Sequence, residues 1–437
     1  MIELKGVGST KSTNLSIEII KTLRKYDLNL NQVIAVTSDN GANMLKTTSL
    51  LSKCLTKFQE EEFLDNDNYQ QLLEEIENDC DIDMGDITIC RCAAHTAQLV
   101  AIDVIKNPNI KEFVLQCRNF TKFLRKQTNG FRCLFELNKV RVPQIDCPTR
   151  WGSTYQMIKD LKTAKPFIET QGNTTSLDLF DVNEQFWKNV DDFLVVFSPL
   201  NDILTKFQEE SLHYGDFYAN WLKCRLLIEK IFNMPNVNSF AKMLADLTLK
   251  FIDKRSVSLH KNDILLACIY FDPRLQHKLS HDEKERAINY LKKLWDRYIS
   301  LNKEYVTKSS NSIEENNGGE EEDILTAFLR QDVIQGCDIN IYTKIERLML
   351  HFETSDCCVL DYWNKRKSLD EELFILSNII FGVPPTQVTI ERAFSSLRII
   401  LSESRNRLSP ETLENILLVK LNPALLDEAI GELSLPN

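Results

Sequence analysis

The sequence contains little glycine or proline, 13 and 12 residues among 437. Because both residues mark turns, their scarcity argues against a turn-rich all-β protein and favours long helices. Long apolar runs are also lacking. The longest, at residues 373–383, contains Ser377 and Asn378 and falls far short of the roughly 20 residues that span a bilayer. No apolar stretch of about 7 to 15 residues follows Met1, so a secretory segment is not expected. The 12 cysteines should therefore be reduced thiols of the cytosol or nucleus.

Positive charge is in the minority as well. The chain has 52 Lys and Arg against 63 Asp and Glu, a formal net charge of -11. An acidic chain repels a polyanion, so any nucleic-acid surface must be local. Hydrophobic residues make up 43% of the chain and charged residues 26%, which are ordinary values for a globular protein. The length and composition together predict a mainly helical protein of two or three domains.

The N-terminal part predicts alternating strands and helices. Residues 14–26 place apolar side chains at four-residue spacing, which is typical of an amphipathic helix. Residues 31–37 are a short β-branched run that ends in a Ser-Asp-Asn-Gly turn, so Asp39 should lie just past the end of a buried strand. After an acidic stretch at residues 59–83, residues 87–90 predict a second strand and residues 95–106 a helix. The pattern is that of an α/β layer.

Strand signals fade from about residue 111 to residue 373, and helical spacing dominates. Two apolar segments illustrate it: Phe193, Val196 and Leu200, then Trp221, Leu226 and Ile228. We interpret this part as a large all-helical insertion. Residues 309–323 are polar and acidic and should form a disordered loop within it.

The C-terminal part predicts further helices. Residues 384–385 are both proline and precede a helix that carries residues 389–395. Ser409 is a good N-cap and Pro410 fits the first helical position, so a helix is expected over 410–421. Its Leu413, Ile416 and Leu417 form an apolar face that either meets a partner chain or packs within this one.

Seven short motifs stand out along the chain. They are residues 36–43 (VTSDNGAN), 91–95 (RCAAH), 149–151 (TRW), 271–274 (FDPR), 361–363 (DYW), 390–395 (IERAFS) and 405–409 (RNRLS). They occur in the order found in one family: the chain resembles the hAT (hobo/Activator) superfamily of DNA transposases, including its domesticated relatives associated with BED fingers.

This resemblance implies an α/β, mostly helical fold. A partial RNase H-like core without its first two strands would occupy residues 1–95, with a strand around residues 2–4. A helical insertion would follow at residues 96–375, and residues 376–437 would complete the core and form the dimerisation region. In the family, two Asp and one Glu hold two divalent ions for strand cleavage, chemistry that needs converging carboxylates. Asp39 matches the second Asp and Glu391 the Glu, and both would be catalytic residues and Mg²⁺ ligands.

The first Asp of that triad has no match in this sequence. Residues 1–26 contain no aspartate, and Asp27 lies in the loop before the strand that precedes Asp39. Two carboxylates cannot hold two Mg²⁺ ions, so the expectation is an inactive centre, in a decayed or domesticated copy or in a truncated sequence. The family's BED zinc finger is not found either.

The resemblance also assigns roles to other residues. Cys92 and His95 would organise the junction between core and insertion, near the active site. A zinc site is not expected there, because Cys90 and Cys92 are spaced too closely and no second ligand pair lies nearby. Arg150 would meet a phosphate and Trp151 would stack on an extrahelical base, although a core Trp explains the pair equally well.

One basic run stands out in the acidic chain. It is interleaved with Phe123 and Phe131 and could contact DNA, or simply be a solvated helix face. Its members are Lys122, Arg125, Lys126, Arg132, Lys139 and Arg141.

The resemblance leads to one main hypothesis and two alternatives. The main hypothesis is a transposase-derived nuclear protein without catalytic activity that dimerises through its C-terminal region and contacts DNA, with no firmly bound cofactor and no membrane partner. The first alternative is an active cut-and-paste transposase, dependent on Mg²⁺ or Mn²⁺, whose N-terminal strands and finger are missing from this sequence. The second is a helical interaction scaffold without a nucleic-acid role.

Overall fold

The computed structural model describes most of the chain. The described residues are 9–39, 41–60, 87–126, 130–147, 151–170, 180, 182–209, 212–302, 340–354, 356–401 and 408–422. The predicted strand around residues 2–4 and the predicted loop at residues 309–323 lie outside them.

The predicted alternation of helices and strands is confirmed over the described N-terminal residues. The elements are α1 (Ser12–Lys25), a 3-10 turn η1 (Leu30–Gln32), β1 (Ala35–Ser38), α2 (Ala42–Glu60), β2 (Thr88–Arg91) and α4 (Ala93–Ile105). The first strand begins later than predicted. Residues 30–32 form a turn instead, closed by a capping box between Asn29 and Gln32.

The two strands pair in parallel, with Ala35 opposite Thr88. Among the described residues they form a two-stranded sheet. Side chains from distant parts of the chain bind the carbonyl groups around β1. The guanidinium of Arg297 donates to the oxygens of Asn31 and Val33 at 2.7 and 2.8 Å. The wider RNase H-like core stays a prediction.

A group of long helices follows α4. It comprises α5 (Pro108–Arg125), α6 (Phe131–Leu137), α7 (Trp151–Thr170), α8 (Glu184–Lys206), α9 (Tyr214–Phe232) and α10 (Ser239–Leu259). Its core is rich in aromatic rings: Phe113 lies 5.7 Å from Phe193 and 5.2 Å from Phe240, centroid to centroid. Such rings bury large apolar areas, which is the main stabilising contribution of this group.

A second helical group contains α11 (Asp263–Tyr270), η4 (Gln276–Lys278), α12 (His281–Leu301), α15 (Ile341–Glu346), α16 (Val359–Arg366) and α17 (Glu371–Phe381). Helix α11 is apolar all round and fully buried from Ile264 to Tyr270. It packs against α9, α12 and α17 and so joins the two helical groups. The chain then returns to the strands through α18 (Val388–Ile400) and α19 (Pro410–Leu421).

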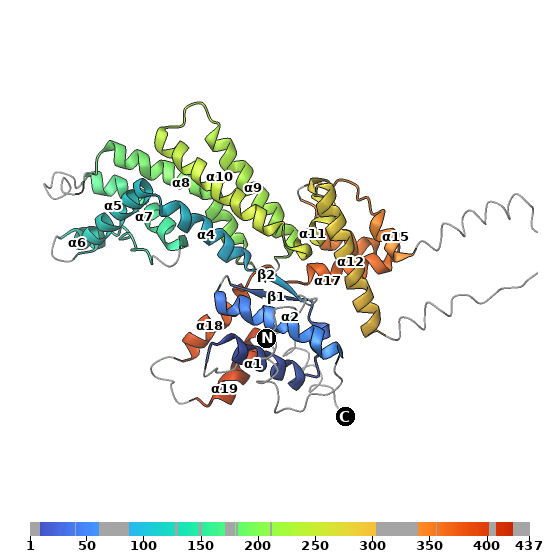
Figure 1. Cartoon of the computed structure of the whole chain (residues 1–437). Coiled ribbons are helices and arrows are strands. Elements are labelled where there is room, and N and C mark those ends of the chain that lie inside the picture. Colours follow the sequence, from blue (N-terminus) through green and yellow to red (C-terminus); the bar gives the residue numbers. More distant parts are fainter. Residues whose placement is uncertain are drawn as a thin grey trace, which may run out of the picture.

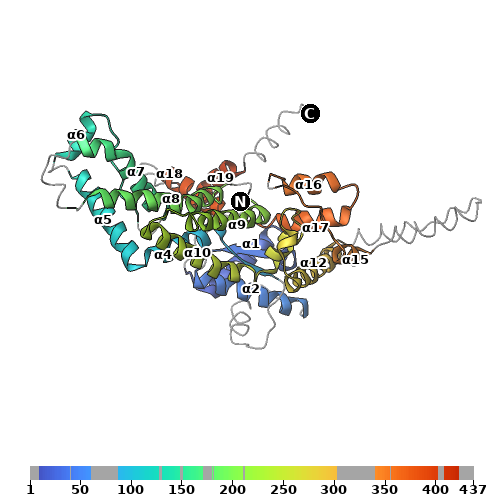
Figure 2. The ribbon, with the colours of Figure 1, turned by 90° about the horizontal axis from the view of Figure 1, so that it is seen from above.

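The strands lie where these groups meet. Figure 1 shows α4–α10 on one side of β1 and β2, α11–α17 on the other, and α1, α2, α18 and α19 below them. Figure 2, turned by 90°, shows the first two groups side by side as well. No described helix is both long and apolar enough to cross a membrane.

The apolar residues of the predicted helical segment at 221–228 lie in α9, but not all on one face. Trp221 and Ile228 are buried in α9, but Leu226 is 60% exposed. With 3.6 residues per turn, a position five residues after Trp221 points about 140° away from it, so Leu226 lies on another face of the helix. The predicted helix over 410–421 has the bounds of α19, with the Ser409 hydroxyl accepting from the Thr412 amide at 3.1 Å.

Candidate functional site

Asp39 directly follows β1 and is exposed. Its Oδ1 accepts a hydrogen bond from the backbone N–H of Gly41 at 2.9 Å. A Cβ at position 41 would lie 2.8 Å from that same oxygen, so a larger residue there would displace the Asp39 carboxylate. The carboxylate therefore stabilises the turn at the end of the strand.

The C-terminal segment reaches this strand end by folding back across most of the chain. The Thr37 hydroxyl donates to the carbonyl oxygen of Pro384 at 2.6 Å, and the Gln387 amide donates to the Thr37 oxygen at 3.1 Å. Glu391 lies one turn after Gln387 in the first turn of α18, where it is exposed. The elements that carry Asp39 and Glu391 therefore meet at Thr37.

The acids described near this point do not fit a two-ion centre. Such a centre needs several converging oxygen ligands. Within the described part of the chain, no group of three or more His, Cys, Asp or Glu side chains could hold a metal ion. We therefore derive no metal-dependent step from this arrangement, and the ligand roles of Asp39 and Glu391 stay predictions.

Cys92 and His95 lie close to the same strand end. Cys92 is buried at the N-terminus of α4, and its N–H donates to the carbonyl oxygen of Ser38 at 2.9 Å. His95 is half-buried in the first turn of α4. The neighbouring Cys90 is fully buried, and burial raises the pKa of its thiol. The bond to Ser38 joins the end of β1 to the start of α4. The organising role of Cys92 and His95 stays a prediction.

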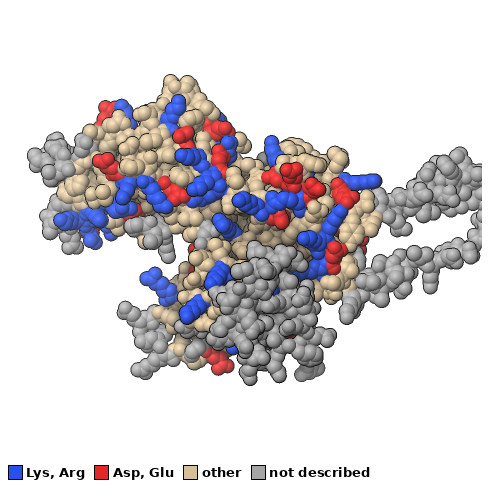
Figure 3. Space-filling view, in the orientation of Figure 1, with Lys and Arg blue, Asp and Glu red and all other residues tan. Residues whose placement is uncertain are grey.

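The basic run lies at the end of α5 and around α6. Figure 3 shows Lys and Arg side chains gathered at the α6 end of the molecule, with basic and acidic side chains mixed over the other helices. Lys122, Arg125 and Lys126 are exposed, but the Arg125 guanidinium also donates to the Pro143 oxygen at 3.0 Å.

Other members of the run have partners within the chain. Arg132 pairs with Glu136 at 3.0 Å, and Arg141 lies 3.9 Å from Asp160. The interleaved Phe123 and Phe131 rings pack against each other with centroids 5.5 Å apart. They are therefore not free to stack on bases. Arg150 and the side chain of Trp151 lie outside the described residues. DNA contact by this region stays a prediction.

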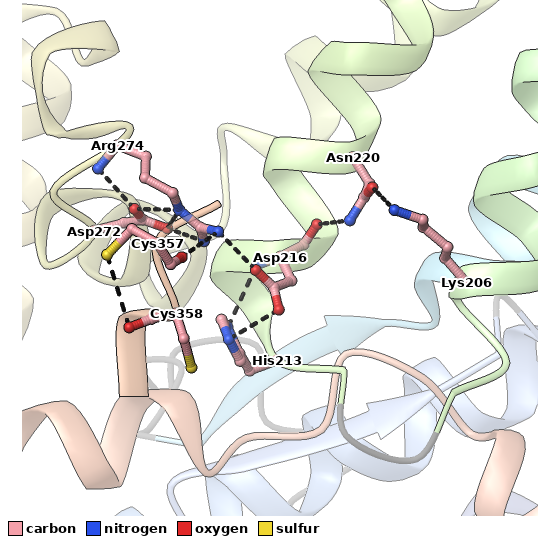
Figure 4. Close-up of polar contacts among 8 residues, drawn as sticks. All are labelled: Lys206, His213, Asp216, Asn220, Asp272, Arg274, Cys357 and Cys358. Atoms are coloured by element: carbon pink, nitrogen blue, oxygen red, sulfur yellow. Dashed lines mark hydrogen bonds and ion pairs between the residues drawn. The ribbon is translucent and has the colours of Figure 1, made fainter. Parts of the chain in front are cut away.

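A charged network that the sequence analysis did not predict lies between the two helical groups and is drawn in Figure 4. Arg274 binds Asp272 through Nε and a terminal nitrogen, at 2.9 and 2.7 Å, and pairs with Asp216 of α9 at 2.9 Å. Asp216 also pairs with His213 at 3.0 Å. Asp272 is fully buried. A Cβ at Gly215 would lie 2.6 Å from its Oδ2, so only glycine fits there.

The charges in this network support one another. Burial alone would raise the pKa of Asp216, but His213 and Arg274 hold it below its usual range. Burial would likewise lower the pKa of Arg274, and Asp272 with Asp216 raises it instead. Asp216 and Arg274 are therefore both charged at neutral pH. This network joins α9 of the first helical group to residues 272–274 and Cys357 of the second.

Two of the seven motifs meet beside it. The Trp363 indole N–H donates to the Phe271 carbonyl oxygen at 2.9 Å, and the two rings stack with centroids 4.9 Å apart. Arg274 also donates to the Cys357 oxygen at 3.1 Å. The motifs at residues 271–274 and 361–363 thus build one buried joint. In the sequence, the feature that pointed to this joint was the combination of aromatic and charged residues in both motifs.

The predicted dimerisation residues divide between core and surface. Leu417 is fully buried, Leu413 is half-buried and Ile416 is 38% exposed. Helices α18 and α19 pack against each other. Leu417 is thus a core residue of this chain, and the exposed apolar surface lies elsewhere on the two helices. Its larger members are Ile390, Phe394, Ile399, Leu401, Ile416 and Val419.

Two regions of the chain match models of known protein families. Residues 90–193 match the model of the ZBED1 RNase-like helical domain, and residues 342–423 match the hAT family C-terminal dimerisation region. A protein of Zea mays described as "Putative AC transposase" is 23% identical over 361 residues. That match covers 76% of this chain and 43% of the maize protein, so the chain spans less than half of its relative.

These matches show that the chain is similar to transposase-related proteins. More narrowly, its two matched regions are similar to domains of the hAT family and its relatives.

Proposed function

We propose that this protein is derived from an hAT transposase and acts by self-association through α18 and α19. Both helices lie within residues 342–423, which match the dimerisation region. Helix α18 carries an apolar stripe at four- and three-residue spacing, here called the α18 stripe: Ile390, Phe394, Leu397 and Leu401. This spacing is typical of a surface that packs against another helix.

Exposure of this stripe is the observation that carries the proposal. Phe394 is 57% exposed and Ile390 50%. Full burial of each such side chain contributes about 1.5 to 3 kcal/mol. On α19, which packs against α18, Val419 is 49% exposed as well. Large exposed apolar side chains on neighbouring helices are typical of a protein interface.

We expect Phe394→Glu to weaken self-association about 30-fold or more, because it places a charge where an aromatic anchor would be buried, a loss of about 2 kcal/mol or more. Sedimentation velocity over a concentration series measures the change. Leu137→Glu on α6 is the matched control, since Leu137 is 78% exposed and far from α18 in sequence. A wild-type chain that stays monomeric, or equal effects of the two variants, would contradict the proposal.

We also propose that the acids described here do not cleave DNA by themselves. Two observations support this: no third ligand joins Asp39 and Glu391 among the described residues, and Asp39 already accepts a bond from Gly41. Strand cleavage by two metal ions needs more ligands than this pair provides.

A nicking assay with supercoiled DNA and Mn²⁺ tests this point. We expect the same background with the wild-type chain, Asp39→Asn and Glu391→Gln, because none of them completes a metal centre. Nicking that disappears in both variants would instead favour an active transposase. Nuclear localisation and DNA contact by Lys122, Arg125 and Lys126 are consistent with the family and stay predictions.

A further inference from the structure

A groove of about 780 Å³ lies between α9 and residues 352–358. The side chains of α9 that line it recur at three- and four-residue intervals, which is the spacing of one helix face. They include Ala219, Lys223, Leu226, Leu227 and Lys230. The other face of α9 is buried in the helical group, so this face is the one left for another molecule.

Both walls of the groove expose large apolar side chains. Leu226 and Leu227 on α9 are 60% and 40% exposed, and Phe352 on the opposite wall is 71% exposed. Isolated exposed leucines are common, but three large apolar side chains facing one groove indicate an interaction site. The part of α9 that lines the groove, from Asp216 to Lys230, is about 21 Å long at 1.5 Å per residue, which matches about four turns of a second helix.

The charge on the α9 wall favours an acidic occupant. Lys223 and Lys230 lie one turn before and one turn after the two leucines, and both are exposed. Neither has an ion-pair or hydrogen-bond partner among the described residues. The opposite wall carries Glu353 and Asp356, so the acidic flank of an occupant would lie over α9.

The two walls are held at a fixed separation. Arg274 pairs with Asp216 of α9 on one side and donates to the Cys357 oxygen on the other, as Figure 4 shows. Both Asp216 and Cys357 line the groove. A site that is already formed loses less entropy on binding, which strengthens the affinity for a matching ligand.

From these observations we propose that the groove binds an amphipathic helix of a partner protein, with its apolar side chains on Leu226, Leu227 and Phe352 and its acidic flank over Lys223 and Lys230. A helix docked in an apolar groove through anchors at three- and four-residue spacing is a recurring mode of recognition. This role is separate from self-association through α18.

Three fluorescent peptides test the proposal by anisotropy with the full chain. The first is helical, with leucines on one face and glutamates along its flank. The second has lysines in place of the glutamates, and the third is a scramble of the first. We expect the first to bind at least about tenfold more tightly than the other two, a difference of about 1.4 kcal/mol.

Variants of the groove sharpen the test. Leu226→Asn should weaken binding of the acidic peptide about tenfold. Lys223→Glu combined with Lys230→Glu should reverse the preference toward the lysine peptide, because it reverses the charge of the wall. Val257→Asn on α10 is the control, since Val257 is 66% exposed and does not line the groove. All these positions are exposed, so the variants should fold normally. Thermal unfolding of each variant checks this.

Equal affinity for the three peptides, or no effect of Leu226→Asn, would overturn the proposal. So would dissociation of the self-associated chain by Leu226→Asn with no peptide bound, because the occupant would then be a second copy. Phe394→Glu should leave peptide binding unchanged, so failure of the self-association proposal can be told apart from failure of this one.

Discussion

Replacing Asp272 with alanine should lower the free energy of unfolding by about 3 to 5 kcal/mol, the usual cost of breaking a buried ion pair by removing one partner. Asp272 is fully buried, and its carboxylate binds the Arg274 guanidinium twice and the Arg274 backbone N–H at 2.9 Å. Its loss leaves the Arg274 charge with Asp216 alone as an acidic partner. Urea denaturation followed by tryptophan fluorescence measures the change.

Asp253→Ala is the matched control for this prediction. Asp253 also binds an arginine, with its Oδ1 at 2.7 Å from Nε of Arg225, but its side chain is 50% exposed. Exposed pairs contribute about 0 to 1 kcal/mol, so we expect little change. If Asp272→Ala were no more damaging than Asp253→Ala, the network would not be what holds the two helical groups together.

Elements with local signals were predictable from the sequence. The bounds of α19 follow from the Ser409 cap and Pro410, both of which act within one turn of the helix start. The start of β1 was not predictable in the same way. The chain before it turns at residues 30–32, and Arg297 binds carbonyl oxygens of that segment from 266 positions away, as in its bond to Asn31. A contact of that range leaves no local trace.

In the candidate site, too, local features could be predicted from the sequence and long-range contacts could not. That Asp39 follows a strand could be predicted from the β-branched run and the turn residues after it. The bonds of Thr37 to Pro384 and Gln387, which bring the helix of Glu391 to that strand, span 347 and 350 positions. They were accessible only through the family resemblance.

Tertiary contacts decide how a basic run is used. A run of basic residues with interleaved phenylalanines is typical of a nucleic-acid surface, but it also fits a solvated helix face. In the structure Arg132 pairs with Glu136 and Phe131 is buried, while DNA contact by the run stays a prediction. Sequence composition cannot distinguish an arginine that faces solvent from one that binds its own chain, because both occur on helix surfaces.

Replacing Arg118 with methionine should lower the free energy of unfolding by about 3 to 5 kcal/mol at neutral pH, because it leaves a buried carboxylate without its cationic partner. Arg118 binds both oxygens of Asp146, at 2.7 and 2.6 Å, and Asp146 has no exposed side-chain surface. The Thr154 hydroxyl donates to the same carboxylate at 2.8 Å. The pair thus fixes the segment that leads into the motif at residues 149–151.

The stability lost in Arg118→Met should depend on pH in the direction opposite to that of the wild type. Burial would raise the pKa of Asp146, but Arg118 and Thr154 hold it below its usual range. In the wild type, the contribution of Asp146 is therefore complete above its unfolded pKa and is lost as the pH falls through the lower folded value. Without Arg118, burial dominates and raises the folded pKa of Asp146 above the unfolded one. The variant should then regain stability as the pH falls.

Unfolding measured across the acid range for Arg118→Met, with Asp146→Asn added in a second variant, separates charge from packing. The double variant should recover much of the loss at neutral pH, because it removes the unpaired charge, and it should show no regain toward acid. Arg132→Met is the control, since that side chain is 44% exposed in its pair with Glu136. A loss in Arg118→Met that is independent of pH and unchanged by Asp146→Asn would mean that Arg118 acts through packing of its stem. The approach to residues 149–151 would then be held by apolar contacts rather than by a buried ion pair.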